Sequence, residues 1–181
     1  FSLILANKLK FKGSFYLFEP VPNLAEACKK TFTNSNYDIN IFDFGLSDIN
    51  SKKDMFISTK GWIGWNTIIS EKATQDMKKI RIKLKSFDKC GLNVTPSFIK
   101  IDVEGAEHLV LRGMMNSFKN WNPLPTILCE IGWGVSHPHW EDLMNIMKEL
   151  KEIGYSAYNL NHSLIDLRII DKTTDVILKP N

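Results

Sequence analysis

Two carboxylates and a glycine follow a short strand-like stretch in the segment FIKIDVEGAEHL, residues 98–109. Asp102 comes directly after four residues of strand character, Glu104 and Gly105 follow, and the pattern then becomes helical. A carboxylate fixed at a strand end can orient a cofactor, accept the proton of a hydroxyl group or hold a metal ion. Asp102 is therefore a candidate catalytic residue and a candidate cofactor contact.

Other predicted strands also end in acidic or polar residues. Residues 14–19, 38–48 and 126–131 read as strands whose last positions are, in chain order, Glu19, Leu46-Ser47-Asp48 and Glu130. Ligands of open parallel sheets bind beyond the carboxyl ends of the strands. We therefore expect these residues to gather along one edge of a sheet and to form a binding site there.

Glu19 has the position of a ribose-binding acid. In nucleotide-binding α/β folds, such an acid ends the second strand, about 20 residues beyond the glycine-rich loop. Counting back from Glu19 reaches the first residues of the chain. We therefore expect the first strand and its glycine loop to lie upstream, with Ser2 just after the loop as a candidate cofactor contact. A helix-start acid before Pro20 is the structural alternative.

The GLSD stretch is the candidate adenine site. Leu46 could pack on the base, and Ser47 or Asp48 could form hydrogen bonds with its amino edge. Because Gly, Ser and Asp also favour turns, a plain turn explains the same residues equally well.

His137 and His139 in the SHPHW stretch could supply a general base, because imidazole titrates near neutral pH. A loop in which Pro138 opens the next helix is the alternative. A zinc site would need a third ligand, and none has convincing spacing, so we expect no metal. Surface positions suffice for His108 and His162.

The elements that must position these residues alternate between strand and helix, which predicts a mostly parallel sheet with helices on both faces. Residues 155–160 and 175–180 add two strands, expected to be antiparallel neighbours. Residues 49–88 form an irregular, insert-like segment without this alternation. Within it, KKIRIKLKSFD favours a solvent-facing strand over a basic lip for an anionic substrate. Trp62 and Trp65 could line a sugar site or pack inside the segment.

Composition limits the class of protein. The chain has 181 residues and a net charge of +3, too mild to indicate binding to nucleic acid or to a membrane surface. No apolar run is long enough to cross a bilayer. Three widely spaced cysteines and the lack of a signal peptide indicate a cytoplasmic protein with reduced thiols. The chain starts with a helical pattern that lacks a capping residue, so we expect residues 1–181 to be a single, N-terminally truncated domain.

The stretches FEPVPN, GLSD and above all FIKIDVEGAEHLVLRGM resemble the FkbM-type S-adenosylmethionine-dependent methyltransferases. The resemblance extends from Phe1 to the last strand. It implies a Rossmann-like methyltransferase fold of seven strands, with the last strand antiparallel. It also implies S-adenosylmethionine as methyl donor, and O-methylation of a hydroxyl on a sugar, glycan or secondary metabolite.

The same resemblance implies roles for individual residues. Glu19 matches the ribose-binding acid of the family, Leu46, Ser47 and Asp48 match its adenine-side loop, and Asp102 matches the acid after the fourth strand. The first motif of the family, an Asp-x-Gly-Ala-Asn-x-Gly-type loop, does not occur in this sequence.

Methyl transfer to an alcohol needs a group that takes the hydroxyl proton. Asp102 and Glu130 end neighbouring strands in the resembling fold, so their carboxylates could act together over the acceptor, or alternatively hold Mg²⁺. Two other classes remain open: a nucleotide-dependent oxidoreductase, which would also use Glu19, and a non-catalytic interaction domain with the same fold.

Overall fold

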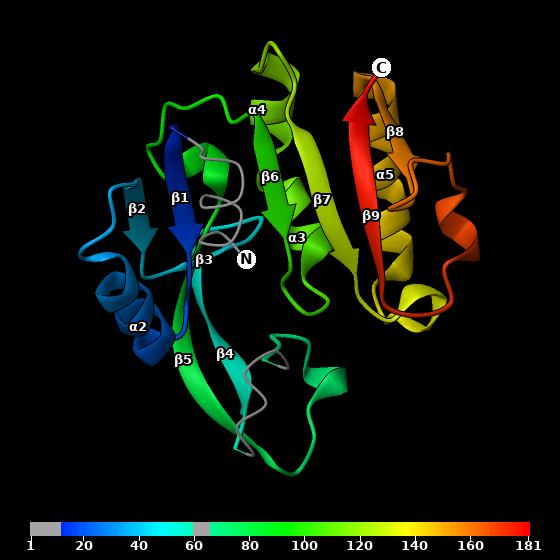
Figure 1. Cartoon of the computed structure of the whole chain (residues 1–181). Coiled ribbons are helices and arrows are strands. Elements are labelled where there is room, and N and C mark those ends of the chain that lie inside the picture. Colours follow the sequence, from blue (N-terminus) through cyan, green and yellow to red (C-terminus); the bar gives the residue numbers. More distant parts are fainter. Residues whose placement is uncertain (1–11, 60–65) are drawn as a thin grey trace.

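A computed structural model describes residues 12–59 and 66–181, which fold into strands and helices (Figure 1). The strands are β1 (Ser14–Phe18), β2 (Asp38–Phe42), β3 (Gly45–Leu46), β4 (Ser51–Ser58), β5 (Met77–Lys85), β6 (Phe98–Ile101), β7 (Thr126–Ile131), β8 (Tyr155–Tyr158) and β9 (Thr174–Pro180). The helices are α2 (Pro22–Phe32), α3 (Glu107–Arg112), α4 (Met115–Asn120) and α5 (Trp140–Ile153). Short 3₁₀ turns cover Ser70–Lys72, Phe87–Lys89, Gly134–Ser136 and Leu167–Ile169.

A four-stranded sheet in the order β6-β7-β9-β8 carries most of the core. β6 and β7 are parallel, whereas β9 runs antiparallel to both β7 and β8. The predicted antiparallel pairing of the last two strands is therefore confirmed. In Figure 1, α3, α4 and α5 lie behind this sheet, where their apolar side chains pack with those of β7 and β9.

The expectation of one mostly parallel, seven-stranded sheet is wrong. The described strands form three sheets, and only β1-β2, β3-β5 and β6-β7 are parallel pairs. The predicted strand over residues 38–48 is interrupted at Asp43 and Phe44, so β2 pairs with β1 while β3 pairs with β5. Gly45 permits this change of partner, because a Cβ there would lie 2.9 Å from Leu84 and 3.3 Å from Pro20.

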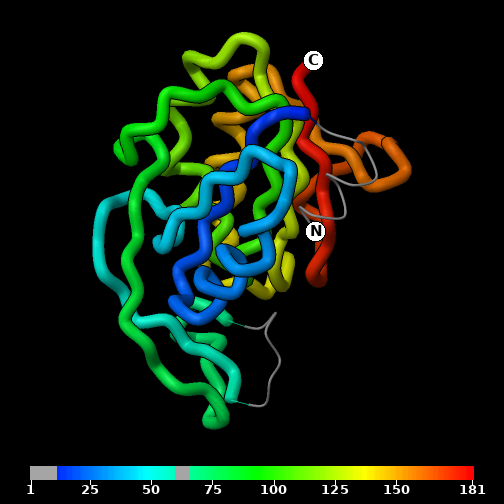
Figure 2. The backbone as a smooth tube through the Cα atoms, turned by 60° about the vertical axis from the view of Figure 1, so that its left-hand side comes forward, coloured from blue at the N-terminus to red at the C-terminus, as the bar shows by residue number. Residues whose placement is uncertain are grey.

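Residues 49–88 contain the long antiparallel pair β4-β5, which extends away from the rest of the chain (Figures 1 and 2). The predicted strand in KKIRIKLKSFD is confirmed as β5, with Ile82 and Leu84 buried. Its outward cations face acids: Arg81 lies 2.8 Å from Asp54, and Lys79 lies 3.8 Å from the same carboxylate. This pairing favours a solvated strand face over a basic lip.

Helix boundaries follow the turn chemistry. α5 buries Leu143, Ile146, Met147 and Leu150, as its period predicts, and it ends at Gly154, whose φ is 121°. The helical stretch that follows Gly105 breaks at Gly113 into α3 and α4. Close packing explains the break, because a Cβ on Gly113 would lie 1.9 Å from the carbonyl oxygen of Ser47.

Within the described residues, no helix combines the length and the apolar character that a bilayer crossing requires. The three cysteines are unpaired, and Cys129 is buried in the sheet core.

Candidate active site

Three carboxylates meet where β6 and β7 end. The two strands are parallel neighbours, and Ile101 pairs with Cys129, so the next residues, Asp102 and Glu130, lie at the same edge. Glu104 joins them from the following loop: one carboxylate oxygen from each of the three residues lies within 4.8 Å of the others. The structure thus brings together the two acids that the sequence paired, and adds Glu104, to which the sequence assigned no catalytic role.

The three acids differ in their electrostatic surroundings. Lys100 Nζ lies 3.1 Å from Asp102 Oδ2 and 3.7 Å from Asp175 Oδ1, so Asp102 has a cation beside it. Burial, and then the charges of Glu130 and Asp102, raise the pKa of Glu104 to about 7. Burial, followed by the charge of Asp102, also raises the pKa of Glu130. Glu104 is therefore the carboxylate of this cluster that is ready to exchange a proton near neutral pH.

Gly105 explains why a glycine follows these acids. Its φ is 95°, and a Cβ would lie 2.1 Å from the Trp133 ring and 2.8 Å from His137 Nε2. Glu104 and Trp133 also have positive φ angles, 50° and 58°. Such backbone conformations are rare away from glycine and gather at functional sites. The loops after β6 and β7 thus lie against each other, with Gly105 at the point of contact.

Glu107, the first residue of α3, is buried, and its Oε1 accepts a hydrogen bond of 2.9 Å from the backbone N–H of Gly105. Burial raises the pKa of Glu107 to about 7. The sequence reading gave Glu107 only a helix-dipole role. Its spacing from Val110, Leu111 and Met114, all buried, is the apolar i, i+3, i+4, i+7 pattern that places it inside.

His108 was expected at the surface, and that expectation is wrong. It is 5% exposed and stacks on His139, with ring centroids 4.9 Å apart. Burial, and then the charges of His139 and His137, lower the pKa of His108 to about 4. Its spacing from the buried Leu111 and Met115, at i+3 and i+7, was the available signal.

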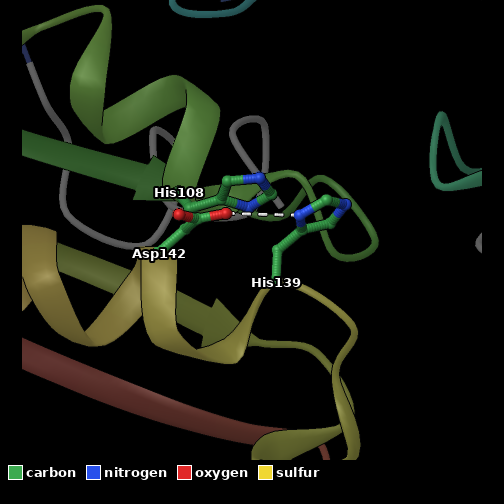
Figure 3. Close-up of side chains that lie close together, drawn as sticks. All are labelled: His108, His139 and Asp142. Carbon is green, nitrogen blue, oxygen red and sulfur yellow. Dashed lines mark hydrogen bonds and ion pairs between the residues drawn. The ribbon is translucent and has the colours of Figure 1, made fainter.

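His137 and His139 lie beside His108, on the loop that leads into α5. His137 Nδ1 accepts the backbone N–H of His139 at 2.9 Å, and its ring stacks on Trp133. Burial lowers the pKa of His137. His139 Nδ1 lies 3.3 Å from Asp142 Oδ2, and Figure 3 shows both side chains next to His108.

Glu19 lies just beyond β1. Its Oε1 accepts the backbone N–H of Val21 at 2.8 Å, immediately before α2, and burial raises its pKa. The helix-start role that the sequence left open is therefore present. This role occupies only one oxygen of the Glu19 carboxylate. The neighbouring Pro20 lies against Gly45, at the start of the candidate adenine segment.

The candidate adenine segment lies between β1 and α3. Ser47 is buried and its hydroxyl donates to Asp48 Oδ1 at 3.0 Å, while Leu46 packs at the border of the main core. Asp48 lies close enough to His108 for its charge to act on that imidazole. Ser2, Trp62 and Trp65 fall outside the described residues.

Comparison with known proteins identifies the relatives of this chain. A family model described as the methyltransferase FkbM domain matches residues 1–157. A search of curated proteins gives no match. Among solved structures, the crystal structure of methyltransferase FkbM from Methylobacillus flagellatus KT superposes with a TM-score of 0.61 at 16% identity. The match covers 98% of this chain and 40% of that one, so the present chain spans about two fifths of the solved protein.

The structural match establishes a shared fold, and the family model covers most of the sequence, including the acids at the ends of β1 and β6. The chain belongs to the methyltransferase FkbM family.

Proposed function

We propose that the protein is an S-adenosylmethionine-dependent O-methyltransferase acting on a hydroxyl of a sugar, a glycan or a secondary metabolite in the cytoplasm. Family membership supports methyl transfer. The observation that carries O-methylation is Glu104, a half-buried carboxylate whose pKa burial raises to about 7. An acceptor hydroxyl needs a base of this kind, because the best general base has a pKa near the working pH.

The residues present fit the nucleoside part of the cofactor. Glu19 uses Oε1 for the Val21 N–H, which leaves its other oxygen to accept from ribose hydroxyls. Leu46 offers an apolar surface, and Asp48 can accept from the adenine amino group. The buried Ser47 hydroxyl already donates to Asp48, so we assign Ser47 to positioning that acid. Ser2 keeps its proposed contact near the methionine part.

When bound, S-adenosylmethionine supplies a methyl group activated by a positively charged sulfur. Glu104 accepts the proton of the acceptor hydroxyl as its oxygen becomes nucleophilic. Asp102 and Glu130 place two further carboxyl groups at this edge, within 4.8 Å of Glu104. The loops at Gly105 and Trp133 hold these acids on rigid strand ends, and alignment of acceptor and donor depends on such rigidity.

The catalytic roles proposed from the sequence are redistributed accordingly. Asp102, whose carboxylate lies 3.1 Å from Lys100 Nζ, is assigned to orient reactants. Glu130 supports Glu104 by repulsion, which raises the Glu104 pKa. His137 uses Nδ1 to hold His139, so the more exposed His139 is the alternative base.

The oxidoreductase alternative has no support in a methyltransferase family. The interaction-domain alternative differs from our proposal in a measurable way, since it requires no methyl transfer. The test is incubation of the full-length protein with isotopically labelled S-adenosylmethionine and a panel of hydroxylated acceptors, read by mass spectrometry with fragmentation. We expect label on oxygen. Label on nitrogen or carbon contradicts O-methylation, and cofactor binding without transfer to any acceptor supports the interaction domain.

A further inference from the structure

Three of the four histidines in the sequence gather at the start of α3 and α5. His108 comes from α3, and His137 and His139 come from the loop before α5, about 30 residues later. Asp142, in the first turn of α5, completes the group (Figure 3). One side-chain ligand atom from each of His108, His139 and Asp142 lies within 4.8 Å of the others.

We propose that His108, His139 and Asp142 form a binding site for one Zn²⁺ ion. Two imidazole nitrogens and one carboxylate oxygen are a donor set that zinc takes in proteins, with the fourth position left to water. Mg²⁺ and Ca²⁺ prefer oxygen ligands throughout, so this set selects against them. The site is distinct from the carboxylate cluster at Asp102 and does not depend on the proposed methyl transfer.

One buried and two partly exposed ligands suit a site that tightens around an ion. Zinc ligands about 2.0–2.2 Å from the metal lie about 3.3–3.5 Å from one another in tetrahedral geometry. His139 Nδ1 and Asp142 Oδ2 already lie at this spacing, 3.3 Å apart. Since the three ligand atoms lie within 4.8 Å of one another, the remaining distances must contract by at most about 1.5 Å. His108 is held in the protein interior, whereas the side chains of His139 and Asp142 are 39% and 56% exposed and can rotate toward it. The buried imidazole thus acts as the fixed ligand.

The surroundings favour a cation and hold the ligands in place. Asp142 brings a negative charge, Asp48 lies near His108, and Glu71 lies near His139. The His137 ring accepts the His139 backbone N–H and so fixes the residue that carries the second imidazole. Partners of this kind orient zinc ligands in known sites. Bound zinc would join α3 to α5 at the edge that carries the candidate active site.

The test uses the full-length protein after chelator treatment, with Zn²⁺ titrated by calorimetry and Co²⁺ binding followed by visible absorption. We expect one ion per chain, an absorption spectrum of tetrahedral cobalt with nitrogen and oxygen ligands, and a zinc-dependent rise in melting temperature. The variants His108→Gln and Asp142→Asn should bind zinc about 100-fold more weakly or worse, since even outer partners are worth about 10–100-fold.

His162→Gln is the matched control, because His162 lies on a distant exposed loop beside Lys179. It should bind zinc like the parent. Asp142→Asn changes an exposed side chain, so it keeps the test informative if His108→Gln fails to fold. The proposal is overturned if no stoichiometric zinc binds, if Asp142→Asn binds like the parent, or if the cobalt spectrum has the charge-transfer band of a thiolate ligand.

Discussion

Burial and neighbouring negative charges raise the pKa values of Glu104 and Glu130 at the ends of β6 and β7. Asp102 has Lys100 at 3.1 Å, whereas Glu104 faces Glu130 and Asp102, so burial and repulsion act on it together. At the scale of single residues, burial and neighbouring negative charge thus make Glu104 the carboxylate that can accept and release a proton at neutral pH.

Replacing Glu104 with Gln should lower turnover by about 10²-fold or more, the usual effect of removing a general base. The parent enzyme should gain activity as the pH rises through about 7, because only the ionised Glu104 accepts a proton. The measurement is the pH profile of methyl transfer for both proteins. Glu152→Gln, at an exposed position of α5, is the control and should leave the profile unchanged. A parent-like profile in Glu104→Gln would move the base to His139.

Replacing Glu19 with Gln should weaken S-adenosylmethionine binding by about 1–3 kcal/mol, because a charged acceptor to the ribose hydroxyls is lost. The amide oxygen of Gln can still accept the Val21 N–H, so the start of α2 should be preserved. Calorimetry measures the affinity, and the melting temperature serves as the control. Unchanged affinity would leave Glu19 with the helix-start role alone.

Residue patterns predicted part of this site. Asp102 and Glu130 could be found because both follow buried strands, and parallel neighbours bring their ends together. Glu104 could not be assigned, since its pKa depends on burial and on Glu130, which is distant in sequence. His108 meets His139 only through the packing of α3 on α5, which no short-range spacing records.

At the scale of elements, the loops after β6 and β7 determine how closely the two strand ends approach. Gly105 faces the Trp133 ring, and both residues have positive φ angles. A close contact at a chain turn also explains why the strand predicted over residues 38–48 was wrong. The strand predicted over residues 38–48 was split because Gly45 packs on Leu84, a contact made by a segment 39 residues away. By contrast, the apolar period of α5 and its end at Gly154 are local features that the sequence itself carries.

Replacing Gly105 with Ala should destabilise the fold by two separate effects. A positive φ in a non-glycine residue costs about 1–3 kcal/mol, and the clash with Trp133 adds about 1–3 kcal/mol of overpacking. Gly91→Ala is the matched control, because its φ is 82° but a Cβ would meet nothing within 4 Å. Urea denaturation gives both free energies of unfolding. If both variants lose the same free energy of unfolding, the Trp133 side chain moves aside without destabilising the fold.

At the scale of the whole molecule, buried acids make stability depend on pH. Burial raises the folded-state pKa of Glu107 from 4.5 to about 7, so the folded protein holds this proton more tightly than the unfolded chain does. The stabilisation from this group is complete below pH 4.5 and is lost as the pH rises through about 7.

Between pH 5 and pH 8, Glu107 should therefore lower the free energy of unfolding by on the order of 2–3 kcal/mol. His108 contributes with the opposite sign, because burial lowers its pKa to about 4. Glu107→Gln keeps an oxygen acceptor for the Gly105 N–H but cannot ionise, so its stability should change less across this range. Urea denaturation at both pH values measures the difference. If the free energy of unfolding of Glu107→Gln depends on pH as that of the parent does, groups other than Glu107 cause the dependence.

Besides the apolar packing of β5 on Ala106, a hydrogen bond connects the β4-β5 pair to the site. Thr67 forms a bridge with Phe56 of β4, and its hydroxyl donates to the carbonyl oxygen of Glu104 at 2.7 Å. The extended pair and the proton-accepting loop therefore share a mechanical link that a single methyl-for-hydroxyl exchange, Thr67→Val, would remove. In the parent protein, amide exchange at Phe56 should therefore report on the conformation of the Glu104 loop. A ligand that orders this loop should slow amide exchange at Phe56, and Thr67→Val should abolish the effect.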